Sequence, residues 1–386
     1  MAQKLYEETN IQAIANAIRA KNGLTTTYKT SEMAAAISAI EGGGGGVNIP
    51  DEAFVISGTC KYWDYNGSWD KFITTYANKW RTSNIIDAQY MFSGSNLETI
   101  PFELNFDSDA VDKIEYIFSS CTKLKELPAL NNLKVDGMTN LFYGCNRLKT
   151  IPENYADTWN WSYVEGQTSS YSCNMSNMFS YCYSLRSIPM NIIKKGNPYV
   201  NYSYSYFYNG FRECYVLDEL NNLPIPYTKA TWTSNAFSST FRKCNRLKNI
   251  TFALLDGQPY VVNWKSQVIE LSADIGYSDI NASILNYNSG ITADKKVKDD
   301  ATYQALKDNP DWFTTNFNYS RYNHDSAVAT INTLPDTSAY LASAGGTNTI
   351  KFKSKSGSAT DGGAINTLTE QEIAVATAKG WTVSLV

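Results

Sequence analysis

The sequence predicts an α/β repeat solenoid with a short all-α module at its N-terminus. Three observations support this fold class: a phenylalanine–cysteine–leucine pattern that recurs between residues 88 and 250, apolar residues at helical spacing within residues 1–41, and a glycine run between the two regions. The 386 residues suffice for two or three domains of ordinary size. With 43% hydrophobic and 18% charged residues, the composition is that of a globular protein.

Residues 1–41 predict two short helices, each with one apolar face. The faces consist of Ile11, Ile14, Ile18, Met33, Ile37 and Ile40. Neither helix can bury its face alone, so we expect this module to attach to a partner or to further copies through these residues. Residues 42–49 contain five consecutive glycines and predict a flexible linker. A phosphate-binding loop is excluded because no strand precedes the glycines and no Gly-Lys-Ser/Thr follows them.

The repeat is anchored on a phenylalanine, after which cysteine, leucine and a second leucine or isoleucine follow at three-residue intervals. The anchors are Phe118, Phe142, Phe179, Phe211 and Phe241, and the cysteines are Cys121, Cys145, Cys182, Cys214 and Cys244. An earlier copy on Phe92 carries Ser95 in place of cysteine. Successive anchors lie 26, 24, 37, 32 and 30 residues apart, too close for each unit to form its own core, so the units are expected to stack.

Each repeat unit is expected to open with a short amphipathic helix. Ile114, Ile117, Phe118 and Cys121, for example, follow the i, i+3, i+4, i+7 spacing of one helical face. A brief strand should follow and end at a proline in several copies. Extra residues fall at one phase of the repeat, at 153–174, 190–207 and 221–236, and should therefore project from one face.

These insertions contain many of the 27 tyrosines and 9 tryptophans of the chain. Tyrosine mixed with serine is typical of antibody contact loops, because rigid rings supply contact area at low entropic cost. The candidate ligand-binding residues are Trp159, Trp161, Tyr163, Tyr202, Tyr204, Tyr206 and Tyr208. The alternative is that these rings pack on the neighbouring repeat.

Little in the sequence points to catalysis, metal binding or a cofactor. The one histidine, His324, precedes a predicted helix and is expected to have a structural role. The cysteines lack Cys-x-x-Cys spacing and keep one phase of the repeat, which favours a ladder of buried thiols. A pair of carboxylates could still form a glycosidase site, because such residues meet only in the fold.

The charge and hydropathy of the chain argue against two classes of partner. A net charge of −4 offers little counterion-release affinity for nucleic acid. No run of about 18 apolar residues predicts membrane insertion, and the first residues do not form a secretory signal peptide.

The segments flanking the repeats are expected to close the stack. Residues 50–87 should form an N-terminal cap, and residues 251–386 should form degenerate repeats and a C-terminal cap. Within the latter, helices are predicted at 301–308 and 325–334, strands at 348–355 and 381–385, and a capped helix over 369–379 that ends at Gly380.

The pattern Met-x-x-Leu-Phe-x-x-Cys-x-x-Leu-x-x-Ile-Pro over residues 88–250 resembles the BspA-type leucine-rich repeat of bacterial surface and phage proteins. Residues 368–382 resemble the segment that usually ends this family. Residues 11–19 and 28–33 resemble the N-terminal module of tail and minor structural proteins in phages of gut Firmicutes.

The resemblance implies a non-enzymatic receptor-binding protein of a phage tail fibre or tail tip. Such a protein would be made in the host cytoplasm and carried in the virion. It would dock on tail or baseplate proteins through residues 1–41 and bind a host-surface glycan or protein. Homo-oligomers, a trimer among them, would raise avidity. Two alternatives are a bacterial cell-surface adhesin of the same repeat class and, more weakly, a capsule- or wall-degrading enzyme.

Overall fold

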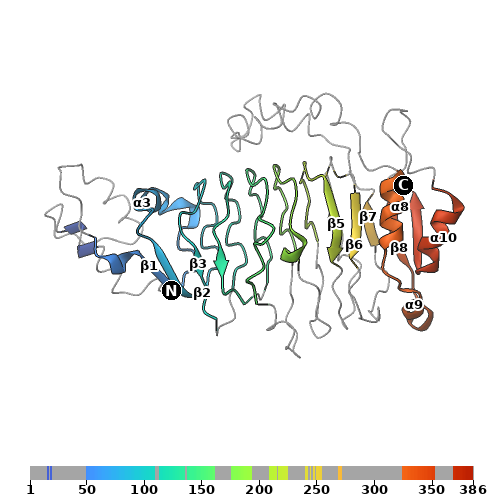
Figure 1. Ribbon diagram of the computed structural model, residues 1–386, viewed down its shortest axis with the longest axis horizontal. Helices are drawn as coiled ribbons and strands as arrows, with labels where there is room; N and C mark the ends of the chain where they lie inside the picture. Colours follow the sequence, from blue (N-terminus) through green and yellow to red (C-terminus); the bar gives the residue numbers. More distant parts are fainter. Residues whose placement is uncertain are drawn as a thin grey trace, which may run out of the picture.

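The chain folds into an elongated solenoid whose coils stack side by side along the long axis (Figure 1). This computed structural model describes residues 15–16, 18–19, 49–108, 113–134, 137–160, 175–193, 208–214, 216–224, 240–241, 244, 247, 249–253, 268–271, 324–352 and 368–385. Of the predicted N-terminal helical module it describes only four residues, among which Ala15 and Ile18 are buried. The all-α character of residues 1–41 therefore stays a prediction, and the glycine linker and the predicted helix at 301–308 lie outside the described residues.

The regular elements are short and are distributed along the whole stack. The first end holds η1 (Asp51–Phe54), β1 (Val55–Thr59), η2 (Tyr65–Gly67), α3 (Asp70–Thr75) and β2 (Arg81–Asp87). The middle holds β3 (Leu104–Asn105), β4 (Leu130–Asn131), η3 (Met190–Ile192), β5 (Glu219–Pro224) and β6 (Asn249–Ala253). The other end holds β7 (Val268–Leu271), α8 (His324–Thr333), α9 (Ser338–Ala344), β8 (Asn348–Phe352), α10 (Glu370–Ala378) and β9 (Trp381–Leu385).

Strand pairing among the described residues is parallel throughout. β1 pairs with β2, β3 with β4 and β5 with β6, while β7, β8 and β9 form a three-stranded sheet. Leu220 of β5 lies opposite Ile250 of β6, and these are equivalent positions of two repeats. The prediction of a brief strand after the leucine is therefore confirmed in these two copies.

The predicted helix at the start of each repeat is wrong for the described copies, which form a series of tight turns instead. The N–H groups of Ile117, Ser119 and Cys121 donate to carbonyls three residues back, at 3.0–3.1 Å. The N–H groups of the residues between them donate to the next coil, Phe118 to Leu141 at 3.2 Å for example. In an α-helix all of these groups would bond within the segment, so half of the backbone donors here join one coil to the next. The repeats thus form a solenoid of the β type, without the helix in each unit that the α/β prediction requires.

Left-handed backbone at two fixed positions makes this turn pattern possible. The residue two before the anchor has positive φ in five described repeat copies and in the coil that precedes them, at Tyr62, Tyr90, Tyr116, Asn140, Asn177 and Asn209. The residue two after it also has positive φ, at Asn66, Gly94, Ser120, Gly144, Tyr181 and Glu213. Asparagine and glycine adopt this conformation at low cost, whereas it interrupts any right-handed helix.

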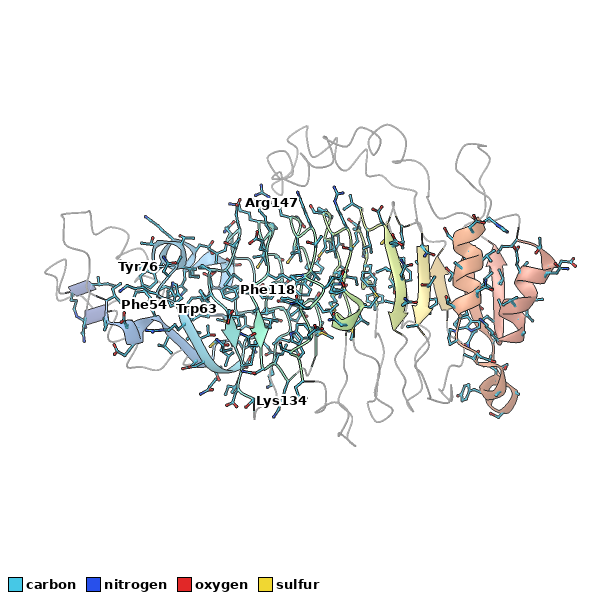
Figure 2. The ribbon with its side chains drawn as sticks, in the orientation of Figure 1. Phe54, Trp63, Tyr76, Phe118, Lys134 and Arg147 are labelled. Carbon is cyan, nitrogen blue, oxygen red and sulfur yellow. The ribbon has the colours of Figure 1, made fainter. Side chains whose placement is uncertain are left out.

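The phenylalanine anchors form one continuous stack inside the coils. Phe118 lies 5.9 Å from Phe142 between ring centroids, with the planes 8° apart, and the stack runs on from Phe142 to Phe179 at 5.5 Å and from Phe179 to Phe211 at 5.3 Å. Phe92 and Phe241 extend it at both ends. Figure 2 shows Phe118 well inside the stack. Parallel rings at this spacing fill the interior with identical shapes at each level, which is how stacked repeats share one core.

The cysteines form a second column, and the prediction of buried thiols is confirmed for those that the structure describes. Each repeat thiol donates to the carbonyl of the anchor one coil earlier. The distance is 2.9 Å from Cys121 to Phe92 and 3.0–3.1 Å from Cys145, Cys182, Cys214 and Cys244 to their acceptors. Burial raises the pKa of these thiols, so they stay protonated and poorly reactive.

The coil pattern extends back to residues 60–67, where Asp64 stands in the place of the anchor. The N–H of Asp64 donates to the carbonyl of Met91 at 2.6 Å, as the N–H of Phe92 does to that of Ile117. In place of a thiol, Ser95 of the next coil donates its hydroxyl to the Asp70 carboxylate at 2.6 Å. A hydroxyl is a stronger donor than a thiol, so Ser95 suits a carboxylate acceptor, which here is Asp70 at the start of α3.

The N-terminal end of the interior is closed by aromatic side chains. Phe54 and Trp63 contact Trp80 edge-on at 5.2 Å, and Trp63 contacts Phe92 of the anchor stack. All four rings are buried. These rings cover the first level of the stack, which would otherwise meet water.

The C-terminal elements agree closely with the sequence. The predicted helix at 325–334 is α8, the strands are β8 and β9, and the helix over 369–379 is α10. Thr369 caps α10 through a capping box with Glu372. Gly380 has a φ of +83°, and a Cβ there would lie 2.8 Å from Thr337 Oγ1, so only glycine fits at this helix end.

Helix α8 packs on the last described coil. Thr330 Oγ1 donates to the carbonyl of Ile250 at 2.5 Å, and the N–H of Phe252 donates to Thr333 Oγ1 at 3.0 Å. Lys379 caps the end of α8 by donating to the carbonyls of Ile331 and Asn332. No helix among the described residues has the length and apolar character needed to cross a membrane.

Candidate functional site

The candidate ligand-binding residues from the sequence differ in where they lie. Trp159 is 5% exposed and contacts Tyr155 edge-on at 5.6 Å, so the structure places this ring in the core. Tyr208 is 40% exposed, at the start of a coil. The remaining candidates, Trp161, Tyr163, Tyr202, Tyr204 and Tyr206, lie outside the described residues, and so do the attachment residues Ile11, Ile14, Met33, Ile37 and Ile40.

The described part of the chain brings another set of tyrosines together, on the first three coils. Tyr62 stacks on Tyr90 with 4.9 Å between ring centroids, and Tyr90 stacks on Tyr116 at 4.4 Å. Tyr65 contacts Tyr62 edge-on at 5.4 Å. Tyr62 is 38% exposed and Tyr65 is 41% exposed, whereas Tyr90 and Tyr116 are half-buried. We call these four residues the tyrosine row.

The positions of these rings follow from the backbone. Tyr62, Tyr90 and Tyr116 each lie two residues before the anchor position and have φ values of 59–64°. The inter-coil hydrogen bonds align them, because Tyr62 donates from its N–H to the carbonyl of Gln89 and Tyr90 to that of Glu115. A bulky residue in left-handed backbone is strained. These three tyrosines are therefore held in a strained backbone conformation while their side chains stay partly exposed.

Polar side chains run beside the tyrosine row. Lys61 donates to Gln89 at 2.9 Å, and Gln89 donates to the Glu115 carboxylate at 2.8 Å. The Lys61 ammonium also lies 5.4 Å from the centre of the Tyr62 ring. Burial raises the pKa of the Tyr90 hydroxyl, as do the neighbouring hydroxyls of Tyr116 and Tyr62. The Tyr90 phenol therefore stays neutral and can both donate and accept hydrogen bonds.

A second tyrosine group lies on later coils. Tyr143 contacts Tyr181 edge-on at 5.2 Å, Tyr181 contacts Tyr183, and the Arg212 guanidinium lies 5.5 Å from the centre of the Tyr181 ring. These residues are half-buried and hold one another in place. A cation over an aromatic face is a modest stabilising contact.

Sequence reasoning missed the tyrosine row because it concentrated on the dense aromatic insertions. The signal was present: tyrosine stands two residues before the anchor in two consecutive copies, at Tyr90 and Tyr116. What the sequence did not indicate was that this position lies in left-handed backbone, where the side chain is only partly covered.

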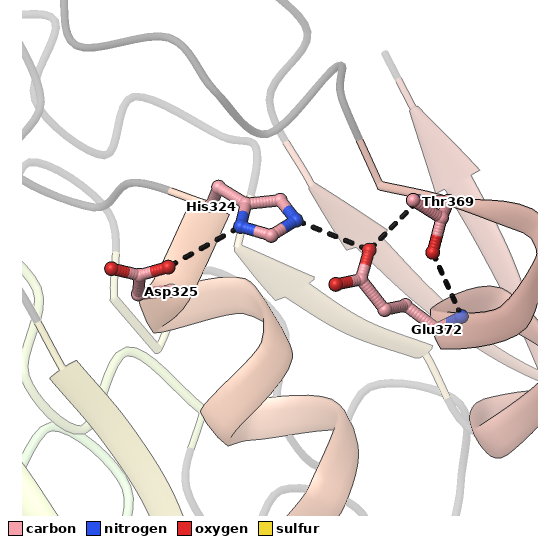
Figure 3. A network of polar contacts seen from close by, with 4 residues as sticks. All are labelled: His324, Asp325, Thr369 and Glu372. Atoms are coloured by element: carbon pink, nitrogen blue, oxygen red, sulfur yellow. Dashed lines mark hydrogen bonds and ion pairs between the residues drawn. The ribbon is translucent and has the colours of Figure 1, made fainter.

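His324 connects two helices. Its Nε2 lies 3.1 Å from Glu372 and its Nδ1 lies 3.3 Å from Asp325, as Figure 3 shows. Glu372 also accepts the N–H of Thr369 in the capping box. Hydrogen bonds to Glu372 and then Asp325 raise the pKa of His324. The contacts join the start of α8 to the start of α10. Among the described residues, no three His, Cys, Asp or Glu side chains form a group that could hold a metal ion.

Part of the chain is similar to a known protein family. Residues 65–186 match the model of a family described as "Mycoplasma protein of unknown function, DUF285". This segment holds less than half of the chain and includes the anchors from Phe92 to Phe179. Searches of curated proteins and of solved structures found no match. The family match and the stacked coils together fit a BspA-type repeat protein.

Proposed function

We propose that this protein is a non-enzymatic receptor-binding protein of a phage tail, and that it contacts the host surface through the tyrosine row. The observation that carries the proposal is the exposure of Tyr62 and Tyr65, which contact each other while Tyr62 stacks on Tyr90. Tyrosine and tryptophan are enriched at binding surfaces because they offer large contact area and a polar group at low entropic cost.

The geometry of the row favours a polar ligand. The rings of Tyr62, Tyr90 and Tyr116 cover one another face to face, so their edges and hydroxyl groups remain for contact. Lys61 and Glu115 beside them supply charges of both signs. Such a surface suits hydrogen bonding to a host glycan or to a polar protein surface, and the insertion tyrosines around Tyr204 stay candidates for further contacts.

The experiment is binding of the labelled full-length protein to host cells. We expect the double variant Tyr62→Ala/Tyr65→Ala to bind at least tenfold more weakly, since each truncation at a binding hot spot costs on the order of 1–2 kcal/mol. Tyr340→Ala, in α9 at the other end of the stack, is the matched control and should bind like the unmodified protein. Equal binding by both variants, with circular dichroism unchanged, would refute a role for the row.

The tail location rests on the resemblance of residues 11–19 and 28–33 to phage tail modules. Gold-labelled antibodies against the solenoid should decorate the tail tip of intact particles. Labelling of the bacterial surface in cells free of phage would instead support an adhesin.

A further inference from the structure

Three consecutive coils place basic residues beside the buried leucine that follows the thiol. These residues are Lys123, Lys125, Arg147, Lys149 and Arg186, and we call them the basic column. Lys125, Lys149 and Arg186 are exposed, while Lys123 and Arg147 are half-buried. Figure 2 shows Arg147 at one edge of the solenoid and Lys134 at the opposite edge.

Backbone hydrogen bonds hold the basic column in register. The N–H of Lys125 donates to the carbonyl of Glu98 at 2.8 Å, and the N–H of Arg186 donates to that of Lys149 at 2.9 Å. Residues joined across adjacent parallel segments lie about 4.8 Å apart. The positive charges therefore repeat along the long axis of the molecule at the spacing of the coils.

Only part of this charge is neutralised. Glu98, at the first end of the column, pairs with Lys125 at 2.6 Å and with Arg147 at 3.0 Å. Within the part of the chain that the structure describes, Lys123, Lys149 and Arg186 make no ion pair. The column therefore keeps three positive charges that a ligand could neutralise.

The charges of Lys123, Lys149 and Arg186 are not needed to pack the coils. Leu124, Leu148 and Leu185 fill the interior at this phase, and the residues on either side of them need only be polar. Like charges on adjacent rungs repel and destabilise the pair. A ligand with negative charges along its length would relieve this repulsion.

We propose that the basic column binds a linear anionic glycan that lies along the axis of the solenoid. The charged groups of the glycan would pair with Lys123, Lys149 and Arg186. A nucleic acid is disfavoured, because its affinity depends on many phosphate contacts, and here three such cations stand on a chain of net charge −4. A sparsely charged polysaccharide needs only these few contacts. The site is separate from the tyrosine row and does not depend on the function proposed for it.

The test compares dextran sulfate with uncharged dextran, which share one backbone, as ligands of the full-length protein. We expect binding of dextran sulfate only, and on the order of tenfold weaker binding at 200 mM than at 50 mM salt. The variant Lys123→Gln/Lys149→Gln/Arg186→Gln should lose at least tenfold in affinity. The control Arg81→Gln/Lys113→Gln/Lys134→Gln changes the net charge equally, at β2 and at bridge residues of the strand segments, and should bind as before.

Equal losses in the two triple variants would show a nonspecific charge effect and overturn the proposal. Tighter binding of a single-stranded oligonucleotide than of dextran sulfate would overturn the choice of a glycan. The Tyr62→Ala/Tyr65→Ala variant should keep its affinity for dextran sulfate, so failure of the host-binding proposal and failure of this one can be told apart.

Discussion

Replacement of Asp64 by asparagine should remove a loss of stability that develops as the pH rises towards 8. Asp64 is fully buried, and its Oδ1 accepts the N–H of Trp69 at 2.7 Å. Burial, and after it the charge of Asp70, raise the pKa of Asp64 from 3.8 to about 8. The carboxyl therefore stays protonated in the folded protein at neutral pH and can donate to Asp70, whereas in the unfolded chain it is ionised.

The sign of the pH effect follows from this difference. Because the folded pKa lies above the unfolded one, the contribution of Asp64 to stability is fully present below pH 3.8 and is lost as the pH rises towards 8. Each tenfold change in proton affinity is worth about 1.4 kcal/mol, which sets an upper limit of about 6 kcal/mol. We expect a measured loss of about 2–3 kcal/mol, since local opening of this first coil can hydrate the ionised group.

In the Asp64→Asn variant the side chain would keep the acceptor for Trp69 and would carry an amide donor towards Asp70 at every pH. The assay is urea unfolding of both proteins at pH 5, 7 and 9. The unmodified protein should lose stability over this range relative to Asp64→Asn, and the variant should be the more stable of the two at pH 9. Asp51→Asn, on an exposed side chain of η1, should follow the unmodified protein. A variant that loses stability in parallel with the unmodified protein would refute the reasoning.

Three further predictions concern the interior. Phe142→Ala should lower the free energy of unfolding by about 3–5 kcal/mol, because it opens a cavity between Phe118 and Phe179. Phe142→Leu should lower it clearly less, and equal losses of the two variants in urea unfolding would argue against a packing effect. Asn140→Ala should destabilise the folded protein by about 1–2 kcal/mol and Asn140→Gly by less than half as much, since φ of Asn140 is +56°. The reverse order of the two variants in thermal unfolding would contradict the assignment of left-handed backbone. In the native protein at pH 8, a thiol reagent should modify no more than one of the seven cysteines, because six are buried in the structure and Cys173 lies outside its described residues. All seven should react in denaturant. Rapid labelling of several cysteines in the native protein would refute the buried column.

The sequence was sufficient for the order of the repeats but not for their local geometry. The phase of the phenylalanines and cysteines predicted stacked repeats with a ladder of buried thiols, and the described residues show both. The C-terminal elements were predicted within a few residues, because Thr369, Glu372 and Gly380 give explicit start and stop signals.

The amphipathic helix was predicted wrongly because i, i+3, i+4, i+7 spacing also fits a series of tight turns that buries the same side chains. The distinguishing evidence was the recurrence of asparagine or glycine at Gly94, Asn140, Gly144, Asn177 and Asn209, which favours left-handed backbone. Two of the candidate ligand residues could be placed, and they differ: Trp159 is buried, whereas Tyr208 is exposed. Alternation of aromatic residues in the sequence cannot distinguish these environments, because burial is decided by the neighbouring coil.

The direction of the hydrogen bonds between coils bears on how the molecule would respond to mechanical force. These bonds run along the long axis, and β1 and α10 lie towards its opposite ends (Figure 1). Tension applied between the two ends would act on all coil boundaries in series, so the weakest boundary would open first while the bonds of the others stay closed. A pulled molecule would then lengthen in steps of one coil, because each level contacts only its neighbours, and could absorb a sudden pull while the remaining levels stay folded.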